Sequence, residues 1–143
     1  MTSRFIIFLF ILFSIDSFSQ GLMEDKLKPT RQDSLRGSIT PEREWWDLTY
    51  YHLDIKVKPD EKFIIGSNTI GYKVLKTNKT MQIDLQEPMK ITSVTSNGKE
   101  LKFNREGNAY FIQLKNKQNK SDINYLKINY EGFPKEAIRA PWD

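Results

Sequence analysis

Alternation of apolar and polar side chains recurs in short segments between Leu48 and Tyr130, and it constrains the fold of this chain more than any other feature. A period of two residues places alternate side chains on opposite faces of a β-strand. Gly, Pro, Asn and Asp separate the segments, and these residues favour turns. The pattern predicts an all-β fold, an antiparallel β-sandwich of about seven strands over residues 45–143.

The clearest predicted strand runs from about Tyr50 to Lys58. Its apolar side chains at 51, 53, 55 and 57 share one face, and His52 lies on the opposite, polar face. We expect the apolar face to be buried. Such burial would contribute about 6–12 kcal/mol before the entropy of the chain is subtracted.

Several positions predict irregularities and turns. In the next strand, expected over residues 63–75, Gly66 and Gly71 suggest a bulge or a change of sheet. Ile91 and Val94 fall out of alternation by one residue, which predicts a bulge there. Asn97-Gly98 predicts a type I′ hairpin turn, because both residues tolerate positive φ.

The first residues have the order of an export signal. Arg4 precedes the apolar run Phe5–Phe13, and small residues at Ser17–Ser19 precede a cleavage point before Gln20. The run is shorter than the ~20 apolar residues of a membrane-spanning helix. We therefore expect a signal peptide over residues 1–19, an exported periplasmic or secreted protein, and no stable membrane span after cleavage.

Residues 20–44 are polar and without a sustained period, so we expect an extended lead-in before the sandwich domain. Within it, Thr40–Glu44 could form a single helical turn with Thr40 as its cap and Pro41 at its first position.

The chain is poor in residues that perform chemistry. It contains one histidine, His52, and no cysteine. A catalytic zinc takes three ligands drawn from His, Cys, Asp and Glu, and a Ser-His-Asp arrangement would also need His52 and its serine elbow. We expect no catalytic residue, no metal site and no cofactor in this chain.

The formal charge of +4 is modest, and its densest basic run, Lys115–Lys120, lies between two predicted strands. A solvated loop explains this run. Nucleic-acid binding would need a basic stripe interleaved with aromatic side chains, so we expect no nucleic-acid partner.

Aromatic side chains are the remaining resource for binding. An exposed set could stack sugars, although most aromatics of a small sandwich are core residues. Trp45 and Trp46 cannot both point inward from an extended segment, so one of them should cover a sheet edge or meet another domain. We name Trp45, Trp46 and Trp142 as candidates for such an inter-domain contact.

An ordered set of short motifs resembles the N-terminal part of aminopeptidase N-like zinc metallopeptidases of Bacteroidetes type. The likeness spans about Leu35 to Asp143, and each motif is weak alone. The motifs are Leu35–Leu48, Tyr51–Pro59, Ile65–Ile70, Leu85–Glu87, Ile91–Val94, Asn97–Lys99 and Ile138–Asp143.

The resemblance implies a saddle-like β-sandwich domain that packs on a catalytic domain and helps to wall its peptide-substrate cleft. The zinc-binding His-Glu-x-x-His of the parent enzyme is not in this sequence, so the chain is expected to be inactive alone, with zinc only in the parent. We expect the domain to be truncated at its C-terminal edge. Unpaired strand edges and an uncovered apolar face would then make it marginally stable or self-associating.

Two alternatives remain open from the sequence. One is a free-standing secreted module that binds carbohydrate or protein through exposed aromatic side chains. The other is an adhesion or assembly protein whose sheet edge is completed by a strand from a partner.

Overall fold

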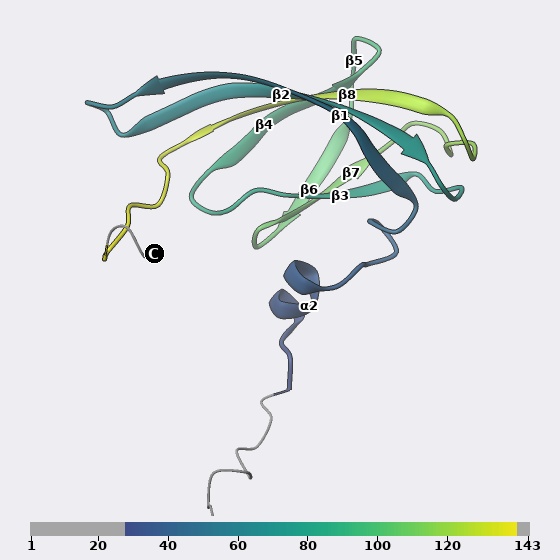
Figure 1. The fold of residues 1–143 in the computed structure, drawn as a ribbon, viewed down its shortest axis with the longest axis horizontal. Helices are drawn as coiled ribbons and strands as arrows, with labels where there is room; N and C mark the ends of the chain where they lie inside the picture. Colours follow the sequence, from purple (N-terminus) through teal and green to yellow (C-terminus); the bar gives the residue numbers. More distant parts are fainter. Residues whose placement is uncertain (1–27, 140–143) are drawn as a thin grey trace, which may run out of the picture.

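The computed structural model describes residues 28–139, in which eight strands form two antiparallel sheets, one above the other (Figure 1). The larger sheet has the strand order β1-β2-β8-β4-β5, and the smaller has the order β3-β7-β6. The elements are α2 (Arg31–Gly37), β1 (Trp46–Lys58), β2 (Phe63–Val74), β3 (Thr80–Asp84), β4 (Lys90–Ser96), β5 (Lys99–Glu100), β6 (Lys102–Glu106), β7 (Ala109–Gln113) and β8 (Ile123–Gly132). The predicted all-β sandwich is confirmed. The expected signal peptide and Trp142 lie outside the described residues.

The long hairpin of β1 and β2 contains one irregularity. The register slips between Leu48 and Tyr50, so Thr49 is an extra residue in β1. A bulge of this kind shifts the alternation by one position. As a result, Trp46 and Leu48 share a face with Tyr51 and the apolar residues that follow it.

The bulge is in β1, opposite Gly71. Strand β2 itself stays in one sheet and pairs with β1 and β8 along its length. The expected change of sheet at Gly66 or Gly71 is therefore wrong. Gly71 is needed for a different reason. A Cβ atom there would lie 2.8 Å from a ring carbon of Tyr125 and 2.9 Å from Cβ of Tyr50.

Two local predictions in the second half of the chain are confirmed. The pairing of β4 with β8 shifts register between Ile91 and Ser93, which is the irregularity that the broken alternation predicted. Asn97 and Gly98 have φ values of 50° and 71° and join β4 to β5, as a type I′ turn requires.

The core lies between the two sheets. Its buried side chains come from both layers, and they are mainly aliphatic with three aromatic rings, those of Trp45, Tyr72 and Tyr110. They include Tyr72, Val74, Met81, Val94, Ile112, Leu126 and Trp45. Burial of a large apolar side chain contributes roughly 1.5–3 kcal/mol, so this layer is the main source of the fold's stability.

The two sheets differ greatly in length. Strands β3, β6 and β7 have 5 residues each, whereas β1 has 13 and β2 has 12. At about 3.3 Å per residue, the smaller sheet is roughly 17 Å long and β1 roughly 43 Å. The smaller sheet therefore covers only part of the inner face of the larger one.

The lead-in is not simply extended, because it contains α2. Thr30 caps this helix through a capping box with Asp33, and Leu35 is buried against Ala109 and Phe111 of the smaller sheet. Arg31 adds hydrogen bonds of 3.0 and 3.2 Å to the Glu106 carboxylate. A short cap motif and a single buried leucine gave too little periodicity for the helix to be predicted.

The predicted turn at Thr40–Glu44 is present. The backbone N–H groups of Arg43 and Glu44 donate to the Thr40 carbonyl oxygen at 2.9 and 3.0 Å. The Thr40 hydroxyl, expected to cap the turn, instead donates to Oε1 of Gln82 at 2.7 Å. The turn is thereby tied to β3.

Candidate functional site

The inner face of β1 is apolar and uncovered. We call the side chains Tyr51, Leu53, Ile55 and Val57 the β1 face. They are 56, 50, 46 and 59% exposed, although the register places them on the same side of the sheet as the core residues of β2. The expectation that these side chains are buried is wrong, because the smaller sheet, which faces them, ends before it reaches them.

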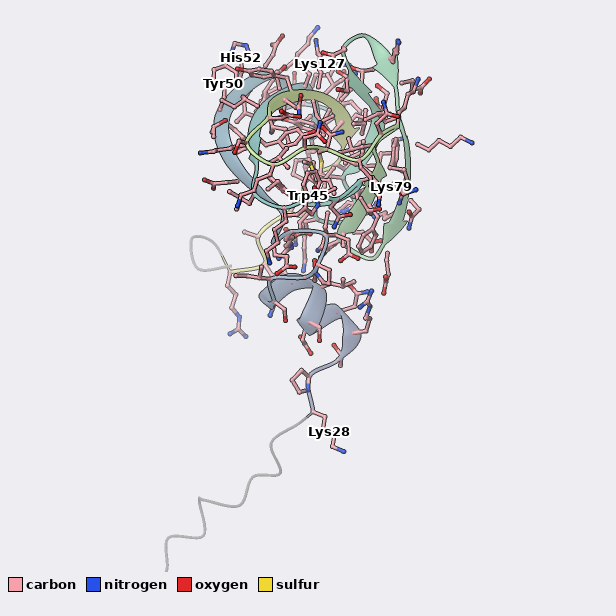
Figure 2. All side chains as sticks on the ribbon, turned by 90° about the vertical axis from the view of Figure 1, so that its right-hand side faces the viewer. Lys28, Trp45, Tyr50, His52, Lys79 and Lys127 are labelled. Carbon is pink, nitrogen blue, oxygen red and sulfur yellow. The ribbon has the colours of Figure 1, made fainter. Side chains whose placement is uncertain are left out.

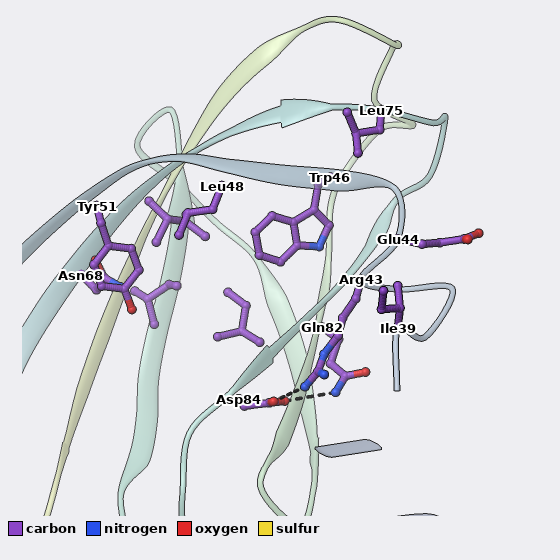
Figure 3. Close-up of a pocket in the computed structure, with 13 residues that line it drawn as sticks. Ile39, Arg43, Glu44, Trp46, Leu48, Tyr51, Asn68, Leu75, Gln82 and Asp84 are labelled. Carbon is purple, nitrogen blue, oxygen red and sulfur yellow. Dashed lines mark hydrogen bonds and ion pairs between the residues drawn. The ribbon is translucent and has the colours of Figure 1, made fainter. Parts of the chain in front are cut away.

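A groove of about 820 Å³ continues the β1 face toward α2 and runs between the edge strands β1 and β3 (Figure 3). Apolar side chains form most of its wall, with a few polar groups at its rim. Its lining residues include Trp46, Leu48, Tyr51, Ile70, Ile83 and Ile128. A cavity of this size and character is typical of a binding site.

Trp46 is held in the wall of the groove. Its ring lies edge-on to Tyr72 with centroids 6.2 Å apart, and its indole Nε1–H donates to the Glu42 carbonyl oxygen at 3.1 Å. The ring is half-buried and still lines the groove. Of the two predicted contact residues within residues 28–139, Trp46 is the one that lines the groove.

Trp45 is in the opposite situation. It is 1% exposed, packs edge-on to Tyr72 with centroids 5.8 Å apart, and donates its Nε1–H to the Thr80 carbonyl oxygen at 2.7 Å. Trp45 is a core residue that contacts both sheets, through Tyr72 of β2 and Thr80 of β3. It has no exposed surface for an inter-domain contact, and the adjacent tryptophans divide into one inward and one groove-lining residue.

The charges at the rim of the groove pair with one another. Arg43 forms an ion pair with Asp84, and Gln82 Nε2 donates to the same carboxylate at 3.1 Å. Lys76 Nζ lies 3.0 Å from a carboxylate oxygen of Glu44. The groove is therefore an apolar trough with a neutralised rim, which favours a neutral, apolar occupant.

Asn68 is the one polar residue on the floor between the β1 face and the core. It pairs with Leu53 across the hairpin and is 6% exposed. Its Oδ1 atom has no hydrogen-bond partner among residues 28–139. A buried carbonyl oxygen without a donor costs roughly 1–3 kcal/mol, so this atom marks a place where an outside donor would be favourable.

The sequence carries a signal for Asn68, which was not among the predicted site residues. Position 68 has the same parity as Ile70, Tyr72 and Val74, so an amide there interrupts an apolar row. A polar side chain in a buried register is the kind of exception that points to function.

Two tyrosine hydroxyls of the larger sheet, those of Tyr72 and Tyr130, have raised pKa values. Burial raises the pKa of Tyr72 to about 12. Burial, and to a smaller extent the neighbouring Tyr51, raise the pKa of Tyr130. Both hydroxyls are neutral at physiological pH, consistent with a binding surface of neutral groups.

The outer face of the larger sheet carries the remaining exposed aromatics. Tyr50, which Figure 2 labels beside His52, is 48% exposed. Tyr125 is 51% exposed, and the two rings lie beside Gly71 with centroids 6.2 Å apart and planes at 70°. This edge-on arrangement gives no flat double platform for a sugar ring.

His52 lies on this outer face as predicted, and it is exposed. No group of three or more His, Cys, Asp and Glu side chains suitable for a metal ion occurs between residues 28 and 139. The donor set of the described chain does not fit a zinc ion. The same range contains no helix long and apolar enough to cross a bilayer.

No protein-family model and no curated protein matches the sequence. The fold, however, is similar to solved zinc metallopeptidases. An M1 zinc metallopeptidase from Deinococcus radiodurans superposes with a TM-score of 0.59 at 18% identity, covering 66% of this chain and 22% of that one. A two-domain M1 zinc metallopeptidase bound to L-arginine gives 0.60 at 17% identity, covering 70 and 23%.

Native leukotriene A4 hydrolase from Saccharomyces cerevisiae is a third similar structure, with a TM-score of 0.51 at 18% identity, covering 62% of this chain and 15% of that one. The matched region is the N-terminal domain region of the M1 enzymes. This chain therefore spans about a fifth of the length of these structures and shares the fold of that region.

Proposed function

We propose that this protein is a non-catalytic N-terminal β-sandwich domain of an exported, aminopeptidase N-like zinc metallopeptidase of Bacteroidetes type. It packs on the catalytic domain and helps to wall the peptide-substrate cleft. The observation that carries the proposal is the similarity of its fold to the N-terminal region of M1 metallopeptidases. Motifs quoted from the sequence support the same assignment in the same order.

The site supports a packing role over a chemical one. The groove and the β1 face are apolar and lack a nucleophile paired with a base. Zinc would belong to the catalytic domain, since His52 is the only imidazole of the chain and lies on the other face. The contact with the catalytic domain would form around Trp46, at the groove.

The proposal is tested by enzyme assay and by reconstitution. The purified chain should not hydrolyse aminoacyl-arylamides in the presence of zinc, and chelator should change nothing. Tightly bound stoichiometric zinc, or turnover abolished by chelator, would overturn it. Co-expression with a zinc-binding M1 catalytic domain should give a complex that Trp46→Ala weakens and Ile65→Ala, on the outer face, leaves intact.

Export is part of the proposal and has its own test. The apolar run Phe5–Phe13 lies outside the described residues, so support comes from the sequence order alone. Mass spectrometry of protein from the periplasm or medium should show Gln20 as the first residue. Retention of Met1 on protein in the cytoplasm would contradict export.

A free-standing binding module is the second candidate, because Tyr50 and Tyr125 are exposed aromatics on one face. Saturable quenching of fluorescence by an oligosaccharide, lost in Tyr125→Ala, would favour it. Trp45→Ala is not a useful probe, because Trp45 is a core residue.

A further inference from the structure

Three of the four sheet edges in the described chain are protected. β5 has only 2 residues, both charged, Lys99 and Glu100. β6 carries Lys102, Arg105 and Glu106 in 5 residues. The edge of β3 is occupied by the lead-in, where the Gln82 backbone N–H donates to the Glu42 carbonyl oxygen at 3.1 Å. Short length, charge and a covering segment are the usual ways to block strand pairing.

Within residues 28–139 the outer edge of β1 is the least protected: it is long, no segment covers it, and only the bulge at Thr49 and a few charged side chains such as Lys56 interrupt it. β1 has 13 residues and pairs with β2 only. From Tyr50 to Lys58 its register is regular, and no proline interrupts it. Its charged side chains point to the outer face of the sheet, while the side chains of the β1 face are uncharged. This edge is open to another strand.

The chemistry of the edge identifies the occupant. A free strand edge offers alternating N–H donors and C=O acceptors along its length, and another extended polypeptide backbone matches that row. The stretch from Leu48 to Val57 is roughly 30 Å long, too long for a small molecule to cover. The paired charges at the rim, Arg43 with Asp84 and Glu44 with Lys76, favour a neutral segment.

Asn68 supplies an independent observation on the same face. Its Oδ1 atom is buried and has no partner in the described chain, and Asn68 itself lines the groove opposite Leu53. An added strand would lie two strand spacings from Asn68, or about 10 Å. A glutamine side chain alone is too short for this distance, so the hydrogen bond requires the glutamine and Asn68 side chains to lean toward each other over Leu53.

We propose that the free edge of β1 is a strand-addition site for an extended, neutral polypeptide segment with alternate apolar side chains. Its apolar side chains extend the β1 face, and one amide donor reaches Asn68. This inference rests on the proposed function, because it specifies the chemistry of the surface that the domain offers to its partner. The experiments below test it without any catalytic domain.

The probe is a capped synthetic peptide of the same length as Tyr50–Lys58, in which valine and threonine alternate around a central glutamine. Titration into the 15N-labelled chain should shift the amide signals of β1 and leave those of β5 unchanged. A peptide N-methylated at alternate residues, which removes its edge donors, should bind at least about tenfold more weakly. Equal binding of both peptides, or shifts confined to another edge, would overturn the proposal.

Variants of the chain locate the contact. Leu53→Lys should weaken binding of the peptide about tenfold or more, because a charge then stands beside the added strand. Ile65→Lys is the matched control, since Ile65 is 41% exposed on the opposite face, and it should leave the affinity unchanged. A larger loss of peptide affinity in Ile65→Lys than in Leu53→Lys would contradict binding at the edge of β1.

Asn68→Leu tests the donor. The wild-type chain should prefer the peptide with central glutamine over one with central methionine, and the variant should lose this preference. The thermal midpoint of the variant should not fall, because the substitution removes an unpaired buried group. An unchanged preference in Asn68→Leu would remove Asn68 from the site. Failure of all peptides, with a complex still formed with a catalytic domain, would reject strand addition and leave the proposed function standing.

Discussion

Tyr51 of β1 and Ile70 of β2 are directly opposite each other in the sheet and point to the same side, yet Tyr51 is 56% exposed and Ile70 is 3% exposed. The boundary of the core runs between these two neighbours. On one side of it a side chain contributes to folding, and on the other it is available to a partner.

Substitutions on the two sides of this boundary should differ in cost. Leu53→Ser on the β1 face should lower the free energy of unfolding by less than about 1 kcal/mol, because Leu53 is half exposed. Leu126→Ala should cost about 2–5 kcal/mol, since Leu126 is fully buried. Denaturant titration followed by tryptophan fluorescence measures both. Similar costs for the two would mean that the β1 face is covered in solution.

The uncovered face should also cause self-association. Sedimentation velocity over a range of concentrations should show species larger than a monomer, and Ile55→Lys should shift them toward monomer. Ile55 is 46% exposed, so a lysine there has room to reach solvent. A wild-type chain that stays monomeric at every concentration would contradict this prediction.

The adjacent tryptophans should respond differently to phenylalanine. Trp45→Phe removes the donor to the Thr80 carbonyl oxygen and leaves a cavity between the sheets, so it should cost about 2–4 kcal/mol. Trp46→Phe also removes a donor, to the Glu42 carbonyl oxygen, but keeps an aromatic ring in the half-buried groove wall and should cost only about 1 kcal/mol. Thermal unfolding of the two variants gives the comparison, and a larger loss for Trp46→Phe would be the contrary result.

The packing of α2 against the smaller sheet should weaken at low pH. Hydrogen bonds from Thr30 lower the pKa of Asp33, and a hydrogen bond from Arg31 lowers the pKa of Glu106. Groups with lowered pKa values stabilise the folded state above their usual pKa, and this is lost as the pH falls through the folded pKa. Amide exchange should therefore speed up in α2 below about pH 4 before it does in β2 or β8. Asp33→Asn with Glu106→Gln should remove this pH dependence.

Tyr72 should make the fold sensitive to alkali. Its pKa is raised to about 12, so the unfolded chain ionises this phenol near pH 10 while the folded chain does not. Its stabilising contribution is complete below about pH 10 and is lost as the pH rises toward 12, at about 1.4 kcal/mol per pKa unit. Tyr72→Phe should flatten the stability curve over this interval, as measured by denaturant titration at a series of pH values.

Much of the fold could be predicted because the information is local. The Asn97-Gly98 turn is specified by two residues with positive φ, and the slip at Ile91 is visible as a break in alternation. The prediction of which β1 side chains share a face is also correct. The prediction that the apolar ones are buried is wrong, because alternation indicates the side of the sheet on which a residue lies and not whether another layer covers that side.

The candidate site was predicted less well. Trp46 was named, and the structure places it at the groove, but Trp45 beside it is a core residue. The extra residue Thr49 was not predicted, although the spacing of three between Leu48 and Tyr51 breaks the alternation as the spacing between Ile91 and Val94 does. Asn68 is likewise visible as an interruption of an apolar row. The exposure of the β1 face could not be seen, because it depends on how far the smaller sheet reaches. Sites built from the ends of layers are set by strand length and register, and single-residue patterns do not encode them.

The extra residue at Thr49 determines which side chains at the start of β1 lie on the inner face of the sheet. If it were deleted, Trp46 and Leu48 would turn to solvent on the outer face, and the groove would lose part of its wall. Protein engineers who shorten or graft this hairpin should therefore treat the spacing of three between Leu48 and Tyr51 as fixed. The same spacing is what to look for when other genomes are searched for chains that present a comparable surface.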